Sequence, residues 1–251
     1  MDYKAMINGI EVHVQYSERT VRELFDPLLE TLTELQRKKG NRILVMLAAP
    51  PGTGKSTLLS FLEYYSGHRI QTIGMDGFHR RQEYLLSHYV DLAGETIPMV
   101  RIKGAPITFD LDQLEAVIQR VAGGEICGWP EYDRRLHNPV EDAVTIDRNI
   151  VLLEGNYLLL DQDGWRDLRK YADYTISIRA DEAMLRNRLI NRKIKTGVER
   201  EEAIRFVDFS DMPNVRLCLE KTMPADFQLY TDGKEYWILN DDARPAPLRN
   251  D

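Results

Sequence analysis

Apolar and polar residues follow two different periods along the chain, and their alternation predicts a mixed α/β fold. Continuous apolar runs are typical of strands buried in a parallel sheet, whereas apolar residues three or four apart indicate helices that cover such a sheet. Strand patterns occupy residues 10–14, 42–48, 69–75, 125–129, 148–153, 174–178, 227–230 and 236–239. Helical patterns occupy residues 17–40, 58–67, 82–90, 111–121, 164–169, 181–195 and 201–221.

Single residues mark where some of these elements begin and end. Ser17 is a suitable N-cap and Gly40 a suitable end for the first long helix. We expect this helix to pack on the core, with the binding of a partner as the alternative. Met212-Pro213 predicts a break in the last helical segment, because proline lacks the N–H that a helix interior needs.

A glycine-bearing loop connects the strand at 42–48 to the helix that follows it. A strand, such a loop, Lys-Ser and a helix, in this order, form the phosphate-binding loop (P-loop) of nucleoside triphosphate enzymes. Gly52 and Gly54 let the backbone wrap around phosphate oxygens without a Cβ in the way, and the helix presents its positive end to the anion. The loop, which predicts an ATP site, is Ala49-Pro50-Pro51-Gly52-Thr53-Gly54-Lys55-Ser56-Thr57.

Three positions of the loop carry its chemistry or depart from the pattern. Lys55 is expected to reach the β- and γ-phosphates, and the Ser56 hydroxyl is expected to ligate Mg²⁺. Ala49 replaces the first glycine of the pattern, and alanine tolerates a positive φ less well. With the alternating strands and helices, the loop predicts an α/β, three-layer P-loop nucleoside triphosphate hydrolase fold, with a mostly parallel sheet and helices on both faces.

Two carboxylates follow two other strands of the predicted sheet. Asp76 comes directly after the strand at 69–75, and Glu154 directly after the strand at 148–153. Ligands of open parallel sheets bind beyond the carboxyl ends of the strands, so we expect both side chains near the γ-phosphate. Asp76 is the candidate general base for an acceptor hydroxyl, and Glu154 is the candidate Mg²⁺ ligand. Which of the two acts as the base stays open.

A polar and aromatic segment at 130–139 is the candidate acceptor site. Tyr132, Asp133 and Arg134 supply an aromatic face, a carboxylate that accepts from hydroxyls, and a donor. These groups suit a polyhydroxylated small molecule. The alternative is an irregular surface loop whose Asp and Arg side chains pair with each other.

Two arginines one helical turn apart, Arg188 and Arg192, share a face of the segment at 181–195. Such a pair can close over a triphosphate and stabilise the charge that develops during phosphoryl transfer, so both are candidate catalytic residues. An arginine-rich helix face that meets only solvent is the alternative.

Composition and charge exclude several classes of protein. With 251 residues, of which 43% are hydrophobic and 29% charged, the chain can bury a full core. The net charge of −7 argues against a nucleic-acid or anionic-membrane partner. Cys127 and Cys218 form neither a disulfide framework nor a metal quartet. Since the sequence has no signal core and no apolar stretch that could cross a bilayer, we expect a cytoplasmic protein with reduced thiols.

Four segments together are similar to those of a known family. They are the P-loop, Met75-Asp76-Gly77-Phe78-His79, Pro130-Glu131-Tyr132-Asp133-Arg134 and Leu153-Glu154-Gly155-Asn156-Tyr157. In this order they resemble the phosphoribulokinase, uridine kinase and pantothenate kinase group of P-loop kinases. The likeness is greatest to its bacterial nucleoside or nucleotide kinase-like branch, which includes fructose transport system kinases, and it covers residues 42–220.

The resemblance implies an ATP-dependent, Mg²⁺-requiring kinase that phosphorylates a hydroxyl of a small molecule. It implies that Asp76 is the base and that Arg188 and Arg192 belong to a lid. Arg134-Arg135 depart from the uridine kinase pattern, which has an aromatic residue there, and leave room for an acceptor that carries a phosphate or a carboxylate. The candidate acceptor-binding residues are Asp76, His79, Tyr132, Asp133, Arg134 and Asn156.

We expect one kinase domain over residues 1–251, with an N-terminal strand and helix at 1–40, a kinase core at 42–220 and C-terminal strands and tail at 221–251. The favoured function is a small-molecule kinase. A nucleotide-gated regulatory ATPase without an acceptor, and a binding module that has lost turnover, are the alternatives. The acceptor stays open among a sugar, a nucleoside, a pantothenate-like alcohol and a phosphorylated sugar, and assembly into a homodimer stays open as well.

Overall fold

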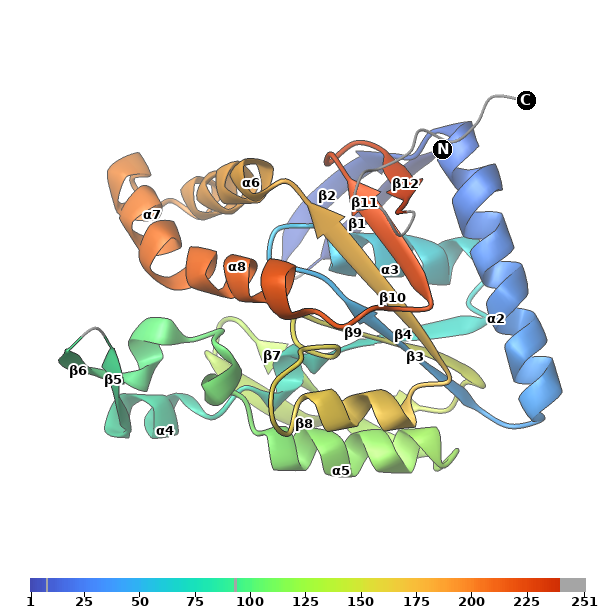
Figure 1. The fold of residues 1–251 in the computed structure, drawn as a ribbon, viewed down its shortest axis with the longest axis horizontal. Coiled ribbons are helices and arrows are strands. Elements are labelled where there is room, and N and C mark those ends of the chain that lie inside the picture. Colours follow the sequence, from blue (N-terminus) through green and yellow to red (C-terminus); the bar gives the residue numbers. More distant parts are fainter. Residues whose placement is uncertain (8, 93, 240–251) are drawn as a thin grey trace.

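A central sheet of six strands organises the molecule, for which the computed structural model describes residues 1–7, 9–92 and 94–239 (Figure 1). Its strands run parallel to one another, except that β12 joins the edge antiparallel to β11. This confirms the mostly parallel sheet and the terminal strand pair expected from the sequence. In spatial order the strands are β12 (Tyr236–Ile238), β11 (Phe227–Thr231), β10 (Tyr174–Ala180), β3 (Ile43–Ala48), β9 (Ile150–Gly155) and β4 (Ile70–Gly74).

Helices cover both faces of this sheet and produce the three predicted layers (Figure 1). Alternate residues of β3 belong to two different buried clusters, because successive side chains of a strand point to opposite faces. One cluster includes α2 (Asp26–Lys39) and α3 (Lys55–Tyr65), and the other includes α5 (Leu111–Ala122). Among the described helices, none combines the length and apolarity needed to span a bilayer.

The N-terminal helix begins and ends where the sequence predicted. The Ser17 hydroxyl accepts the N–H of Thr20 at 3.1 Å, and Gly40 ends the helix with a φ of 68°. Between them α1 (Glu18–Thr20), a π-helical turn (Val21–Phe25) and α2 follow one another without interruption.

A group of three helices lies at one end of the sheet and packs around its own buried cluster (Figure 1). It comprises α6 (Glu182–Lys195), α7 (Arg200–Phe206) and α8 (Met212–Lys221), with a π-helical turn (Val207–Asp211) between α7 and α8. The break predicted at Met212-Pro213 is wrong, because α7, the π-helical turn and α8 follow one another without interruption and Asp211 and Met212 keep right-handed helical backbone angles. The π-helical turn directly precedes Pro213, whose ring nitrogen has no hydrogen to donate within the helix.

Three hairpins flank the sheet and account for two errors of the sequence-based prediction. The helix expected at 82–90 is wrong beyond Ser87, because the backbone turns extended at His88. The irregular loop that was the alternative for 130–139 is also wrong, because these residues belong to a hairpin, in which Pro130 lies at a bulge where a strand tolerates proline. The elements are β1 (Asp2–Ile7) with β2 (Ile10–Gln15), α4 (Gln82–Ser87), β5 (Tyr89–Leu92) with β6 (Glu95–Pro98), and β7 (Cys127–Asp133) with β8 (Asn138–Ile146).

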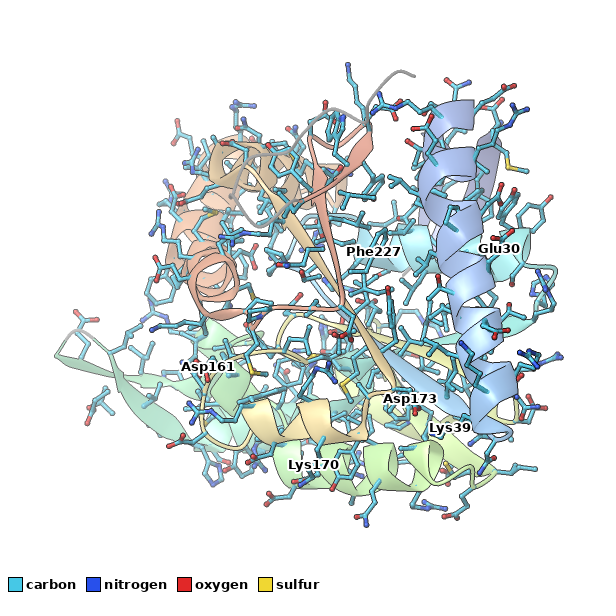
Figure 2. All side chains as sticks on the ribbon, turned by 45° about the vertical axis from the view of Figure 1, so that its right-hand side comes forward. Glu30, Lys39, Asp161, Lys170, Asp173 and Phe227 are labelled. Atoms are coloured by element: carbon cyan, nitrogen blue, oxygen red, sulfur yellow. The ribbon has the colours of Figure 1, made fainter. Side chains whose placement is uncertain are left out.

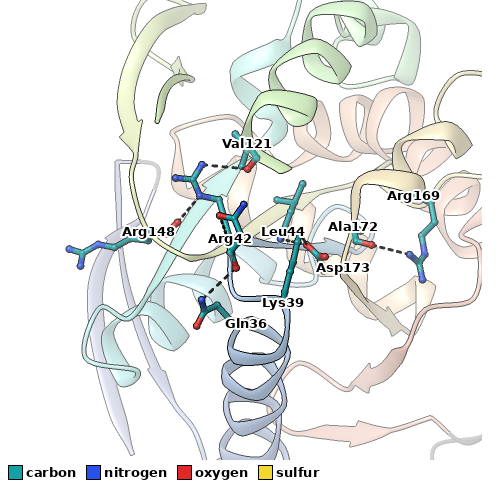
Figure 3. Close-up of polar contacts among 10 residues, drawn as sticks. Gln36, Lys39, Arg42, Leu44, Val121, Arg148, Arg169, Ala172 and Asp173 are labelled. Atoms are coloured by element: carbon teal, nitrogen blue, oxygen red, sulfur yellow. Dashed lines mark hydrogen bonds and ion pairs between the residues drawn. The ribbon is translucent and has the colours of Figure 1, made fainter. Parts of the chain in front are cut away.

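A buried arginine holds the amino end of β3 (Figure 3). Arg42 is only 3% exposed, and its Nε donates to the carbonyl oxygen of Arg148 at 2.7 Å. Its terminal nitrogens donate to three further backbone carbonyls, those of Val121, Glu125 and Ile146. The guanidinium thereby joins α5, β8 and the start of β9 to the strand that leads into the P-loop.

The carboxylate of Asp173, at the same end of the sheet, connects β3, the end of α2 and the start of β10. Asp173 accepts the N–H of Leu44 at 2.8 Å, and its own N–H donates to the carbonyl of Leu44 at 2.8 Å. The same carboxylate pairs with Lys39 at the end of α2, 2.8 Å away (Figures 2 and 3). These contacts fix β3 between the helix before it and β10 beside it.

Replacing the buried arginine tests this account. Arg42→Met is expected to lower the free energy of unfolding by about 2–4 kcal/mol, because several buried carbonyls lose their donor. Urea denaturation at neutral pH measures the change. Arg22→Met, on an exposed helix face, is the matched control. A loss no larger than that of the control would show that the network contributes little.

Candidate active site

The P-loop lies between β3 and α3, as predicted. Gly52 and Gly54 have φ values of 88° and 90°, a left-handed conformation that glycine adopts without strain. A Cβ on Gly52 would lie 3.2 Å from the Cγ of Leu189, so α6 packs directly against the loop. Ala49 is buried and its φ is not positive, so the alanine that replaces the usual glycine leaves no backbone strain.

Glu154, at the carboxyl end of β9, contacts both functional side chains of the P-loop. Ser56 Oγ donates to Glu154 Oε1 at 2.5 Å, and Lys55 Nζ lies 3.8 Å from Oε2. Burial raises the pKa of this carboxyl, and the neighbouring lysine opposes the effect. A hydroxyl and a carboxylate are hard oxygen donors of the kind that Mg²⁺ takes together with phosphate and water. Ser56 and Glu154 therefore fit the predicted metal site.

Asp76 lies in a short 3₁₀ helix, Met75–Phe78, which follows β4. It lines a cavity of about 620 Å³, the acceptor cavity, whose wall also includes Ser56 and Glu154. The P-loop and both predicted carboxylates therefore meet at one cavity. The Asp76 side chain is half exposed, and its Oδ2 lies 3.8 Å from the guanidinium of Arg134.

The glycine after Asp76 allows a close approach of two backbones. A Cβ on Gly77 would lie 2.0 Å from the carbonyl oxygen of Pro130, where no side chain fits. β7 therefore packs directly against the turn that carries Asp76. The Asp-Gly pair thus brings the β7–β8 hairpin to the wall of the acceptor cavity.

The β7–β8 hairpin brings three predicted residues to this cavity. Tyr132, Asp133 and Arg134 all line it. Asp133 also accepts the backbone N–H groups of Leu136 and Arg135, which lower the pKa of its carboxyl and stabilise the turn. Since the hairpin itself engages this carboxylate, its binding of an acceptor hydroxyl stays a prediction.

Two other predicted residues, His79 and Asn156, lie outside the wall of the acceptor cavity. The imidazole of His79 packs on Phe109, and its Nδ1 lies 2.9 Å from the carbonyl oxygen of Asp76. Burial lowers the pKa of His79. Within the described part of the chain, the buried Oδ1 of Asn156 has no hydrogen-bond partner. Contact of either side chain with an acceptor stays a prediction.

The two arginines of α6 lie over the P-loop. Both line a second cavity of about 410 Å³, the P-loop cavity, together with Lys55 and Ser56. Arg188 Nη1 donates to the carbonyl oxygen of Thr53 at 3.3 Å. Desolvation lowers the pKa of Arg192, and the negative charge of Asp211 opposes this effect. The predicted lid pair therefore faces the loop, and its catalytic role stays a prediction.

The model of the Phosphoribulokinase / Uridine kinase family matches residues 44–227 of this chain, which is well over half of its length. The chain belongs to this family. It is 39% identical to "Uncharacterized protein YggC" of Escherichia coli K12, over 90% of this chain and 94% of that protein. It is 31% identical to "Putative uridine kinase C227.14" of Schizosaccharomyces pombe, over 79% of this chain and 86% of that protein.

A solved structure agrees with the family assignment. It is the structure titled "putative fructose transport system kinase" from Silicibacter sp. TM1040, with a TM-score of 0.68 and 30% identity. The likeness covers 75% of this chain and 89% of that one. The resemblance inferred from the four sequence segments and the predicted P-loop kinase fold are both confirmed.

Sequence reasoning missed several residues that line the two cavities of this phosphoribulokinase / uridine kinase family member. They include Thr72 and Glu131 in the acceptor cavity, and Ile7 and Ile10 from the N-terminal hairpin. The hairpin had a signal, because an Asn-Gly pair between alternating apolar residues favours a tight turn. Thr72 stands in no motif, so nothing local marked it, whereas Glu131 lies within the family segment at 130–134 and was not singled out there.

The close approach at Gly77 can be tested by adding one methyl group. Gly77→Ala is expected to lower the free energy of unfolding by about 1–3 kcal/mol, because the methyl group collides with the backbone of β7. Urea denaturation measures the change. Gly74→Ala is the control, since its Cβ would meet no atom closer than 3.6 Å. Equal stability of the two variants would contradict the packing role.

The burial of Glu154 predicts a pH-dependent effect in the ligand-free protein. Burial raises the pKa of the Glu154 carboxyl in the folded protein, so its ionisation lowers the free energy of unfolding. This loss is complete above the folded pKa and disappears as the pH falls to the unfolded pKa. Glu154→Gln is therefore expected to raise the thermal midpoint at pH 8, with a gain that shrinks toward pH 5. Differential scanning fluorimetry without Mg²⁺ measures it, with the exposed Glu131→Gln as the control. A gain that grows toward acid would refute the assignment.

Proposed function

We propose that the protein transfers the γ-phosphate of ATP to a hydroxyl of a small molecule, with Mg²⁺ as cofactor. The observation that supports this most directly is that Ser56 of the P-loop and the carboxylate of Asp76 line one cavity. A hydroxyl beside Asp76 would then lie close to the γ-phosphate, and phosphoryl transfer depends on such proximity. Family membership and the names of the relatives support the class of reaction.

Each group of side chains has a chemical role in this proposal. The P-loop N–H groups and Lys55 bind the β- and γ-phosphates, while Ser56 and Glu154 would hold Mg²⁺, which neutralises phosphate charge when bound. Asp76 accepts the proton of the acceptor hydroxyl as the hydroxyl oxygen bonds to phosphorus. The two arginines of α6 balance the charge on the transferred group.

The charges around the acceptor cavity favour a neutral, polyhydroxylated acceptor. Arg134 lies 3.8 Å from Asp76 and Arg135 lies 3.4 Å from Asp133, so each arginine of the hairpin already has a carboxylate beside it. Glu131 adds another carboxylate to the wall. An anionic acceptor would compete with these carboxylates, whereas the hydroxyls of a sugar or nucleoside can donate to them. We therefore favour a sugar or nucleoside over a phosphorylated sugar.

We also expect a cytoplasmic location and small-molecule partners. Both cysteines, Cys127 and Cys218, are free and buried, which fits a reducing compartment. The net charge of −7 disfavours a nucleic-acid partner.

Removing the proposed base tests the function. Asp76→Asn is expected to slow phosphoryl transfer by about 10²–10⁴-fold, because an amide cannot take the hydroxyl proton. The affinity for Mg²⁺ and a non-hydrolysable ATP analogue should stay close to that of wild type, whereas Lys55→Ala should lose it. The measurements are ADP release with a panel of sugars, polyols, nucleosides and sugar phosphates, and calorimetric nucleotide binding.

Three outcomes would change the proposal. ADP release near its maximum without any acceptor would favour the regulatory ATPase instead. Equal loss of nucleotide binding in Asp76→Asn would make Asp76 a metal ligand or a structural residue. Turnover confined to sugar phosphates would refute the neutral acceptor.

A further inference from the structure

The β1–β2 hairpin precedes the part of the chain that matches the family, yet it reaches the candidate active site. The family match begins at residue 44, far beyond the end of β2. Tyr3 anchors the hairpin on α3. Its phenol oxygen lies 2.6 Å from Ser60 Oγ, and its ring packs edge-on against Phe61, with centroids 5.5 Å apart.

One face of this hairpin is apolar and turned toward the protein. Along both strands, half-buried residues alternate with exposed ones. Ile7 pairs with Ile10 in the strand register, so the two isoleucines close the apolar face at the tip of the hairpin. The half-buried residues are Tyr3, Ala5, Ile7, Ile10, Val12 and Val14.

Ile7 lies where the two cavities meet. It lines both the acceptor cavity and the P-loop cavity. Among the described residues, only Ser56 and Arg134 share this property. Ile10 and Val12 continue the apolar wall within the P-loop cavity. An apolar side chain therefore lines the same two cavities as Ser56, the proposed metal ligand, and Arg134, the ion-pair partner of the proposed base Asp76.

We propose that Ile7 and Ile10, at the facing ends of β1 and β2, cover the point of phosphoryl transfer and keep water from the γ-phosphate. This inference rests on the proposed function. During transfer the acceptor oxygen bonds to the γ-phosphorus, the bond from that phosphorus to the bridging oxygen of ADP breaks, and the hydroxyl proton passes to Asp76. Water in place of the acceptor gives ADP and inorganic phosphate by the same exchange of bonds. Apolar side chains offer water no hydrogen bond and so disfavour it there.

The first test measures ADP formation from Mg·ATP without any acceptor. Ile7→Ser and Ile10→Ser are expected to raise this rate at least about threefold, because serine admits water. Lys4→Ala is the matched control, since Lys4 is exposed on the outer face of the same strand. Adding Lys55→Ala to each variant should abolish the rate. An unchanged or lower rate in both serine variants would overturn the proposed cover.

The second test needs no turnover. Because Cys127 and Cys218 are buried, a maleimide should react first with a cysteine introduced into the hairpin. Mg²⁺ with the imido analogue of ATP is expected to slow the modification of Ile7→Cys several-fold and to leave Lys4→Cys unchanged. The same analogue should raise the thermal midpoint of the wild type.

These readouts separate the inference from the function on which it rests. If the analogue neither stabilises the wild type nor protects position 7, the proposed function fails and the cover fails with it. If the analogue stabilises the wild type but protects neither position, only the cover is overturned.

Discussion

The candidate site depends on a buried carboxylate beside the P-loop. β9 lies between β3 and β4, so Glu154 at its carboxyl end stands between the strand that leads into the P-loop and the strand that leads to Asp76, where ligands of parallel sheets bind. A buried carboxylate is unfavourable unless nearby groups compensate its charge. Lys55 and Ser56 do so here, and they are the same groups that a P-loop uses for phosphate and Mg²⁺. In the ligand-free site, Glu154 therefore holds in place the two side chains that are predicted to bind phosphate and Mg²⁺.

Close approaches of backbone determine where the cavities form. Gly77 lets the backbone of β7 contact the turn that carries Asp76, and Gly52 lets α6 pack on the P-loop. A side chain at position 77 would displace the β7–β8 hairpin from the turn that carries Asp76, and a side chain at position 52 would press α6 away from the P-loop. Two glycines thus place the β7–β8 hairpin and α6 around the candidate active site, and the two cavities are the spaces that remain between these elements.

The walls of the candidate site come partly from the region that the family model matches and partly from the segment that precedes this region. The P-loop, β7–β8 and α6 lie within the matched region, whereas the β1–β2 hairpin precedes it. Under our proposal the shared core supplies phosphate binding and proton transfer, and the extension limits access of water. The anchoring of Tyr3 on α3 connects the two, because α3 begins at Lys55 of the P-loop.

The sequence by itself determined the order along the chain of the six strands of the central sheet, the P-loop, the family and the two strand-end carboxylates. These features depend on local periodicity and on contiguous motifs, which can be recognised in the sequence before any tertiary contact is known. Only the tertiary structure decided that residues 130–139 form part of a hairpin, that His79 lies outside the wall of the acceptor cavity, and that Ile7 lines the P-loop cavity. Each of these depends on which distant segments pack together. Pro130 is an example, because proline disfavours a strand locally but is accommodated here at a bulge in the pairing of β7 with β8.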